Sequence, residues 1–261
     1  MQATHYKSDY PTIKKRGTCP ERRSGKRGVL LIHGFTGHTE CVSGLLPYLE
    51  AEGIEYEMPW LRGHGTKPED LEGVKAEDWY EDGYKALCKL SERVDTIIIV
   101  GLSMGGLVAL NLCMREHECR AKIAACVTWA AALSFVNPFA RLVKPLSFIF
   151  KSWPGQESFN DAECRKKCKN YPRFPTKAFG ELYDFAKETK KNVGQLNVPF
   201  CTIQSRKDQV IPFTMSEYLF DHVNSPYCEL VALEKSGHEL GQDCESECVF
   251  EQTMRFIHEI W

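Results

Sequence analysis

The sequence lacks any long apolar run. A membrane-spanning helix needs at least about 18 consecutive, mostly apolar residues. The longest candidate, Ile123 to Val136, is interrupted by Thr128 and Ser134. Internal repeats and low-complexity tracts are also missing. We therefore expect a globular protein without a transmembrane helix, and the 261 residues are enough to build one large core.

The chain also has little net charge. Its formal charge is −2, and the basic clusters Lys14–Arg16 and Arg165–Lys169 are short. We therefore expect solvated surface at these clusters and no nucleic-acid partner. The N-terminal segment, residues 1–27, is polar and basic and lacks the apolar centre of a signal peptide. These features predict a cytoplasmic protein, and they leave the oligomeric state open.

Cysteine is abundant, with twelve residues. Since no export signal is evident, we expect thiols and no disulfide framework. Two C-x-x-x-C pairs have the spacing that would place both sulfurs on one face of a helix, namely Cys164 with Cys168 and Cys244 with Cys248. A structural zinc site would need two further ligands. We predict no metal site and no organic cofactor.

Short apolar runs alternate with longer amphipathic stretches, which is typical of βαβ units and a parallel sheet. The expected strands are Gly28–Gly34, Gly53–Trp60, Thr96–Gly101, Lys122–Ala131, Pro199–Ser205 and Cys228–Glu234. The expected helices are Cys41–Glu52, Ala76–Arg93, Gly106–Glu116, Thr214–Asn224 and Cys244–Glu259. Because most of these strands are apolar on both faces, helices should cover both sides of a mostly parallel central sheet.

Residues 133–195 interrupt this alternation. They are rich in aromatic residues and proline and contain no strand-like run at the required spacing. Helical spacing is followed by Phe139, Leu142, Val143 and Leu146, and a second amphipathic helix is predicted over Lys177–Lys191. We predict an α/β core formed by residues 28–132 and 196–261, with residues 133–195 inserted as a cap, or lid, over the sheet.

The pattern GxSxG occurs at Gly101 to Gly105, after an apolar strand and before an apolar helix. This context is typical of a nucleophile elbow, in which a sharp turn exposes the serine hydroxyl. Glycines two residues before and after Ser103 would remove Cβ atoms that collide with neighbouring backbone. The rival glycine motifs fail, because GxGxxG needs glycine at Ser103 and a P-loop needs lysine at Leu107. An incidental serine in a glycine-rich turn is the alternative.

A nucleophilic serine needs a histidine base that is oriented by a carboxylate. Asp208 and His238 each lie just past a predicted strand, in the chain order serine, acid, histidine. Asp208 could instead cap the helix that begins near Pro212, and His238 could be an ordinary loop residue. The fallback acids, neither of which directly follows a strand of the sheet, are Asp184 and Asp243.

Acyl transfer also needs hydrogen-bond donors for a developing oxyanion. In an elbow one donor is the backbone N–H of the residue after the nucleophile, here Met104. The loop His33–Gly37 follows an early strand, and we expect the Phe35 N–H to be the second donor. His33 is expected to brace this loop by hydrogen bonding and not to transfer protons.

The motifs LLIHGFTG, LRGHG, GLSMGG, KDQVIP and SGHE occur in this order along the chain. In this respect the sequence resembles the α/β-hydrolase superfamily and, within it, the bacterial carboxylesterase and monoacylglycerol lipase group. The resemblance implies Ser103 as nucleophile, Asp208 as acid, His238 as base, and Phe35 and Met104 as oxyanion donors. HGFTG stands where prolyl peptidases of this fold usually have HGGPG, which argues against a prolyl peptidase. Dehalogenases and epoxide hydrolases have aspartate at the position of Ser103, so the serine argues against both classes of enzyme.

The resulting hypothesis is a serine hydrolase that cleaves short- to medium-chain acyl esters or monoacylglycerols through an acyl-enzyme. Thioester, cinnamoyl or feruloyl ester and C–C bond hydrolysis on the same triad are alternatives, and a non-catalytic ligand-binding homologue is a more remote one. The expected pocket residues are Phe35, Met104, Phe135, Phe139, Leu142, Leu146, Phe148, Ile149, Phe150 and Trp153, although the cap residues among them could merely pack the cap onto the core.

The expected partner is a small ester or lipid. Aromatic residues next to Arg141, Lys144 and Lys151 could also touch a membrane surface. The sequence assigns no role to His64 or to the pair Asp78-Trp79.

Overall fold

The computed structural model describes residues 12–19, 25–156 and 158–261. Most of the N-terminal segment expected at residues 1–27 therefore lies outside the described residues. Among the helices of the described part, none is long and apolar enough to cross a bilayer.

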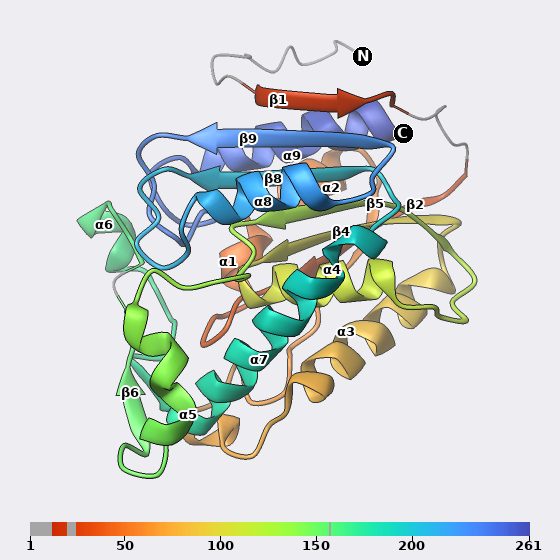
Figure 1. The fold of residues 1–261 in the computed structure, drawn as a ribbon. Helices are drawn as coiled ribbons and strands as arrows, with labels where there is room; N and C mark the ends of the chain where they lie inside the picture. Colours follow the sequence, from red (N-terminus) through yellow and green to blue (C-terminus); the bar gives the residue numbers. More distant parts are fainter. Residues whose placement is uncertain (1–11, 20–24, 157) are drawn as a thin grey trace.

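A twisted sheet of seven strands forms the centre of the described structure, in the order β1-β9-β8-β5-β4-β2-β3 (Figure 1). All neighbouring strands are parallel except β1, which runs antiparallel to β9. The strands are β1 (Thr12–Gly17), β2 (Arg27–Ile32), β3 (Glu55–Glu57), β4 (Thr96–Leu102), β5 (Lys122–Trp129), β8 (Phe200–Ser205) and β9 (Tyr227–Leu233). The predicted α/β class with a mostly parallel sheet is confirmed.

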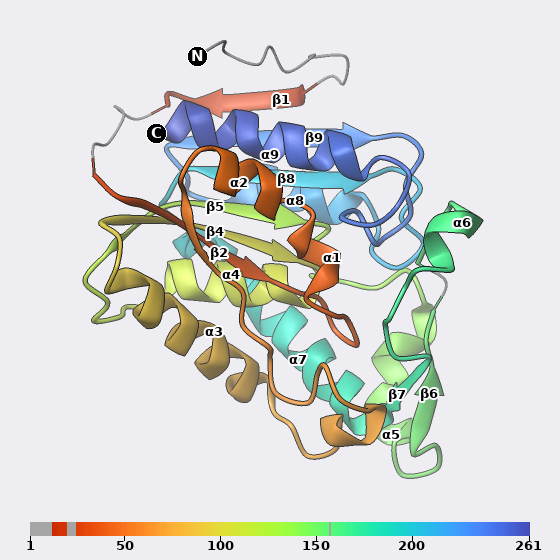
Figure 2. The same ribbon diagram turned by 180° about the vertical axis from the view of Figure 1, so that it is seen from behind.

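Helices cover both faces of the sheet, as Figures 1 and 2 show from opposite sides. On one face lie α3 (Ala76–Ser91), α4 (Met104–Met114), α7 (Thr176–Asn192) and α8 (Thr214–His222). On the other lie α1 (Glu40–Ser43), α2 (Leu46–Ala51) and α9 (Ser246–Ile260). The remaining short turns of helix are α5 (Val143–Leu146), α6 (Ala162–Arg165), η1 (Pro68–Leu71), η2 (Pro138–Leu142) and η3 (Val193–Gln195).

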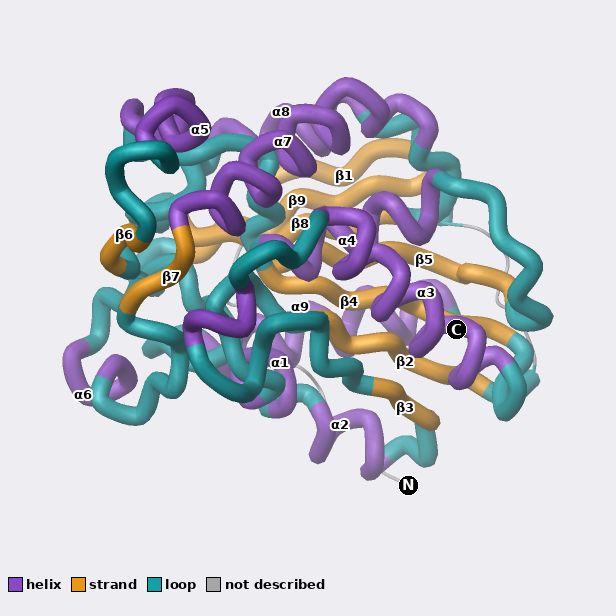
Figure 3. Tube along the Cα trace, turned by 90° about the horizontal axis from the view of Figure 1, so that it is seen from below, coloured by secondary structure: helices purple, strands orange, loops and turns teal. Residues whose placement is uncertain are grey.

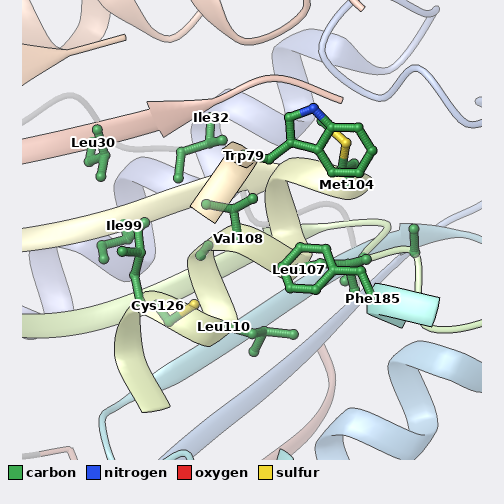
Figure 4. Packing of buried hydrophobic residues seen from close by; sticks show 14 of the residues in the cluster. Leu30, Ile32, Trp79, Ile99, Met104, Leu107, Val108, Leu110, Cys126 and Phe185 are labelled. Atoms are coloured by element: carbon green, nitrogen blue, oxygen red, sulfur yellow. The ribbon is translucent and has the colours of Figure 1, made fainter. Parts of the chain in front are cut away.

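The apolar core has two halves, one on each side of the sheet. Figure 4 shows part of the first half, which includes Trp79 of α3 together with Met104, Leu107 and Val108 of α4. Every residue of β4 is buried, which explains its uninterrupted run of apolar side chains. The helix α4 lies between the sheet and the helices α3 and α7, and every residue of its first turn is buried.

Several elements differ from the expected ones, and β3 is much shorter than the strand expected over Gly53–Trp60. The strand β1 was not predicted, because its sequence TIKKRG has little of the β-branched, apolar character of an interior strand. Such a charged sequence suits the edge of a sheet. The expected helix Cys41–Glu52 is divided into α1 and α2 at Gly44, where a Cβ atom would lie 2.3 Å from Cζ of Phe250. Gly44 and Leu45 both keep helical φ and ψ, and the glycine leaves room for the Phe250 ring of α9.

The segment between β5 and β8 contains the residues expected as a cap. Its first part lies beyond the carboxyl ends of the parallel strands, and its helix α7 returns along α4 (Figures 1 and 3). Two short strands that the sequence did not predict, β6 (Ser152–Pro154) and β7 (Arg173–Pro175), pair antiparallel in this segment. The helix expected over Lys177–Lys191 is α7. Asn111 Nδ2 ties it to α4 by donating to Thr189 Oγ1 at 2.7 Å.

Candidate active site

Ser103 occupies the sharp turn between β4 and α4. Its φ is +54°, a value that is costly for a residue with a side chain. Its backbone N–H donates to the carbonyl of Trp129 at 2.8 Å, which fixes the turn on β5. A Cβ atom on Gly101 would lie 2.2 Å from the carbonyl oxygen of Gly105, and one on Gly105 would lie 2.2 Å from that of Ile32. The two glycines thus permit the backbone contacts that the turn requires.

Three side chains from separate loops meet at the carboxyl end of the sheet. The distance between Ser103 Oγ and His238 Nε2 is 2.8 Å, across 135 residues of sequence. His238 Nδ1 and Asp208 Oδ2 are also 2.8 Å apart. Because an ionised carboxylate can only accept, Nδ1 carries the proton and Nε2 is left to accept from the serine hydroxyl. The residues predicted as nucleophile, acid and base are thus joined in one chain of hydrogen bonds.

Asp208 has further contacts that fix its orientation. Its Oδ1 accepts from the backbone N–H groups of Val210 and Ile211, at 2.8 and 2.9 Å. Gln204 Nε2 donates to Oδ2 at 3.2 Å. Since α8 begins only at Thr214, Asp208 closes the turn after β8 and does not cap this helix. The aspartate therefore holds its own loop and faces His238 at the same time.

The charge environment of His238 favours its protonated form. Burial by itself would lower the pKa of this histidine. The negative charge of Asp208, the hydrogen bond to Asp208 and the charge of Glu239 outweigh that effect and raise the pKa above its ordinary value. An imidazole of this kind accepts a proton readily, as a general base must.

The loop after β2 approaches the serine closely. A Cβ atom on Gly34 would lie 3.3 Å from Cβ of Ser103. The loop turns sharply, with Thr36 at φ +60° and the Gly37 N–H donating to Gly34 O at 3.1 Å. Among the described residues, no backbone carbonyl accepts from the N–H of Phe35 or of Met104. Two amide donors close to Ser103 are therefore available to another acceptor.

Two buried histidines brace this loop. The Leu61 N–H donates to His33 Nε2 at 3.1 Å, so His33 Nδ1 must donate to Gly34 O, 2.9 Å away. The Thr36 N–H donates to His64 Nε2 at 3.0 Å. Burial lowers the pKa of His33 to about 4 and that of His64 to about 3, so both are neutral near pH 7. The expected bracing role of His33 is confirmed, and His64 shares it.

The sequence assigned no role to the motif LRGHG or to Trp79. Besides presenting His64, the motif receives a hydrogen bond from Trp79 Nε1, which donates to Arg62 O at 3.1 Å. The Trp79 ring lies edge-on to Phe35 at a centroid distance of 5.8 Å. In the sequence, the RGHG motif after the second predicted strand indicates a loop with a supporting role. The motif does not indicate which other loop it supports.

Ser103 and His238 open into a cavity of about 320 Å³, a size suited to a small molecule. Apolar side chains form much of its wall, and those that were expected there are Phe35, Phe135, Phe139 and Trp153. The described lining does not include the expected residues Met104, Leu142, Leu146, Phe148, Ile149 and Phe150.

The local backbone explains this difference. Residues 138–146 do not form a continuous helix but a 3-10 turn, η2, followed by the short α5. The residues expected on one helical face therefore do not all point the same way. Ala140 and Val143 turn inward to line the cavity, while Phe148 and Ile149 remain 88% and 73% exposed. Met104 is fully buried below the cavity, against the core.

The other acids considered have different surroundings. Asp184 forms an ion pair with Lys144 on the surface. Asp243 is buried, and its carboxylate accepts from the backbone N–H groups of Asn160, Asp161, Gly237 and Cys244. It joins the inserted segment to the turn that carries His238.

Neither C-x-x-x-C pair lies within one helix, because Cys168 follows the end of α6 and Cys244 precedes α9. Within the described ranges, no three histidine, cysteine, aspartate or glutamate side chains cluster as ligands for a metal ion.

Comparison with known proteins places this architecture in a family. Residues 24–245 match the family described as "Serine aminopeptidase, S33". A carboxylesterase of Bacillus subtilis (strain 168) is 27% identical over 241 residues, covering 91% of this chain and 95% of the relative. A thermostable monoacylglycerol lipase of Bacillus sp. (strain H-257) is 28% identical over 238 residues, covering 90% and 91%.

Among solved structures, one from work on LipS and LipT, two metagenome-derived lipolytic enzymes, superposes with a TM-score of 0.83 at 28% identity. The match covers 96% of this chain and 99% of that one. The chain therefore belongs to the serine aminopeptidase S33 family of α/β-hydrolases, and it is a hydrolase of the carboxylesterase and monoacylglycerol lipase group.

Proposed function

We propose that this hydrolase cleaves carboxylic esters with Ser103 as nucleophile, His238 as general base and acid, and Asp208 as the carboxylate that orients His238. The unbroken pair of 2.8 Å contacts from Ser103 through His238 to Asp208 is the observation that supports these roles. The backbone N–H groups of Phe35 and Met104 are the oxyanion donors in this proposal, because both flank the serine and neither is occupied by a described backbone carbonyl.

The chemistry follows from these positions. Ser103 Oγ attacks the ester carbonyl carbon while its proton passes to His238 Nε2. The tetrahedral oxyanion is held by the two N–H groups, and His238 then gives its proton to the departing alcohol oxygen. Water attacks the acyl-enzyme and loses a proton to Nε2, and that proton returns to Ser103 as the carboxylic acid leaves. Asp208 stabilises the imidazolium and is not itself protonated.

The substrate class is proposed from the cavity and the relatives together. Phe35, Phe135, Phe174 and Phe179 offer an apolar wall for an acyl chain. Among the similar proteins are a carboxylesterase and a monoacylglycerol lipase. We propose short- to medium-chain acyl esters or monoacylglycerols as substrates. Residues 133–195 serve in this proposal as the cap, since they contribute much of the cavity wall.

A labelling experiment tests the catalytic roles. A fluorophosphonate should modify Ser103, and Ser103→Ala should lose both labelling and ester turnover. A matched control is Ser147→Ala, because Ser147 is not part of the described cavity lining and its hydroxyl donates to Lys144 O. Full turnover by Ser103→Ala would rule out Ser103 as the nucleophile. A protein that neither labels nor hydrolyses any ester would instead favour a non-catalytic ligand-binding homologue. A panel of acyl thioesters, feruloyl esters and diketones beside the esters separates the alternative substrates.

We further propose that the cap touches lipid surfaces. Six of the large exposed apolar residues come from one stretch of 15 residues: Val136, Phe139, Leu142, Phe148, Ile149 and Phe150. Arg141 and Lys151 are exposed beside them, which suits an anionic surface. Vesicles of phosphatidylcholine with phosphatidylglycerol should bind the protein, and the double variant Phe148→Ser with Ile149→Ser should bind them less. Equal binding of both proteins, or binding of neither, contradicts this contact.

A further inference from the structure

The cavity wall changes character beside His238. Most of the lining is apolar, but Asn170 and Glu239 form a polar patch next to the base. Glu239 follows His238 directly in the chain, whereas Asn170 belongs to the inserted segment between α6 and β7. Hydrolysis of an ester does not require either side chain in the steps described above, so their presence at this position calls for a separate explanation.

The two side chains are paired with each other and leave hydrogen-bonding capacity unused. Asn170 Nδ2 donates to Glu239 Oε1 at 2.8 Å. The second oxygen of each group, Asn170 Oδ1 and Glu239 Oε2, is buried and has no hydrogen-bond partner among the described residues. Glu239 as a whole is 7% exposed. Buried polar atoms in proteins are nearly always paired, so two adjacent exceptions in a cavity wall indicate a polar ligand.

Backbone contacts hold this patch in place. The N–H groups of His238 and Glu239 both donate to Ser158 O, at 2.7 and 3.1 Å. On the other side, the N–H of Tyr171, the residue after Asn170, donates to Thr36 O at 2.9 Å. The patch is therefore fixed both to the turn that carries the base and to the loop beside the serine. A group bound there has a defined position relative to both.

The charge state of Glu239 bears on the ligand. Burial raises the pKa of this carboxyl, and the negative charges of Asp208 and Asp243 add to the effect, against the opposing influence of His238 and Asn170. The free amide oxygen of Asn170 accepts a hydrogen bond, and the free oxygen of Glu239 accepts one when the carboxyl is ionised and can donate one when it is protonated. A hydroxyl group can both donate and accept, so it matches this pair in either state, whereas an anion does not.

We propose that Asn170 and Glu239, paired in the cavity wall next to His238, form a subsite that binds a hydroxyl group on the alcohol half of the ester. The inference rests on the proposed function, in which His238 gives its proton to the departing alcohol and so must lie beside it. The apolar wall then holds the acyl chain, and the polar patch selects esters whose alcohol carries a further hydroxyl.

Two esters of the same acid test this subsite. 1-Monooctanoylglycerol and propyl octanoate differ only in the hydroxyl groups of the alcohol. In the wild-type protein kcat/KM should be higher for the glycerol ester. Asn170→Ala and Glu239→Ala should each lower the ratio of the two kcat/KM values about tenfold, as expected for a lost hydrogen bond.

Matched variants control for general damage. Glu239→Gln keeps a donor and an acceptor and should retain most of the preference. Asn192→Ala and Glu188→Gln alter another Asn–Glu pair, joined at 3.1 Å on the outer surface of α7, and should leave the ratio unchanged. A ratio that stays at the wild-type value in both alanine variants overturns the subsite. If neither propyl octanoate nor the glycerol ester is hydrolysed by wild type, the proposed function itself has failed.

A second measurement needs no variant and decides the matter if the alanine variants do not fold. Acyl-enzyme formed from p-nitrophenyl octanoate divides between water and an added alcohol. Glycerol should capture more octanoyl groups per mole than 1-propanol, because its hydroxyl groups can bind Asn170 and Glu239 while another attacks. Equal or poorer capture by glycerol contradicts the subsite.

Discussion

His64 Nε2 accepts a hydrogen bond from the backbone N–H of Thr36 at 3.0 Å. This contact joins two loops that follow neighbouring parallel strands, β2 and β3. Thr36 has a positive φ and directly follows Phe35, a proposed oxyanion donor. In the proposed mechanism, the orientation of the Phe35 N–H toward the substrate should therefore depend on a buried histidine that does not touch the substrate.

The first prediction concerns this contact. His64→Ala removes the acceptor for the Thr36 N–H and leaves the loop free to turn away, and misplacement of about 1 Å can cost about a hundredfold in rate. We expect kcat to fall by about tenfold to a hundredfold with little change in KM, measured with a p-nitrophenyl ester. His222→Ala, on the exposed side of α8, is the control and should be close to wild type. Unchanged kcat in His64→Ala would show that the loop is held by other contacts.

The second prediction is the pH dependence. The neutral form of His238 is the active base, so kcat/KM must fall as the pH drops through the pKa of this histidine in the free enzyme. Since Asp208 raises that pKa above 6.5, the acid limb should lie above this value. Asp208→Asn removes the negative charge and should lower the pKa while greatly reducing the rate. If kcat/KM of the wild type does not fall at low pH, His238 is not the base. The same conclusion follows if Asp208→Asn is active enough to measure and its acid limb has not moved.

Much of the fold could be predicted from the sequence because the signals are local. The buried strand β4 and the turn at Ser103 lie within a few residues of each other, and the loops of Asp208 and His238 each follow a strand. Contacts between distant segments were not predictable in this way. The charged strand β1 is held by Lys15, which pairs with the buried Glu229 of β9 at 2.6 Å.

The inserted segment shows the same limit. Helical spacing predicted α7, which is long and amphipathic. It did not predict the short η2 and α5, where Pro145 interrupts any regular helix. The pairing of Asn170 with Glu239 spans 69 residues and joins the insertion to the core, so no local pattern announces it.

The third prediction concerns the glycines of the turn. Gly105→Ala would place a Cβ atom 2.2 Å from Ile32 O, which is backbone and cannot move aside cheaply. We expect a loss of about 3 kcal/mol or more in the free energy of unfolding, together with loss of activity. The control is Gly180→Ala within α7, where the nearest atom is Lys144 Cγ at 3.4 Å. That helix interior should gain about 0.5 to 1 kcal/mol. Chemical denaturation measures both, and a stable, active Gly105→Ala would exclude the close contact with β2.

The fourth prediction separates Asp243 from Asp208. Asp243 is 1% exposed and its carboxylate accepts four backbone hydrogen bonds, two of them from Asn160 and Asp161 of the inserted segment and one from Gly237. Asp243→Asn turns an amide NH₂ toward these donors, so unfolding should become easier by about 3 kcal/mol.

Asp243→Asn should also differ from Asp208→Asn in its kinetics. Because Gly237 directly precedes His238, kcat should fall in Asp243→Asn, but the acid limb of the pH profile should stay near its wild-type position, since Asp208 still faces the imidazole. Asp184→Asn, which breaks a surface ion pair, should change stability by less than about 1 kcal/mol. If Asp243→Asn shifts the acid limb as Asp208→Asn does, while stability is unchanged, then Asp243 acts on the charge of His238 and not by anchoring its turn to the inserted segment.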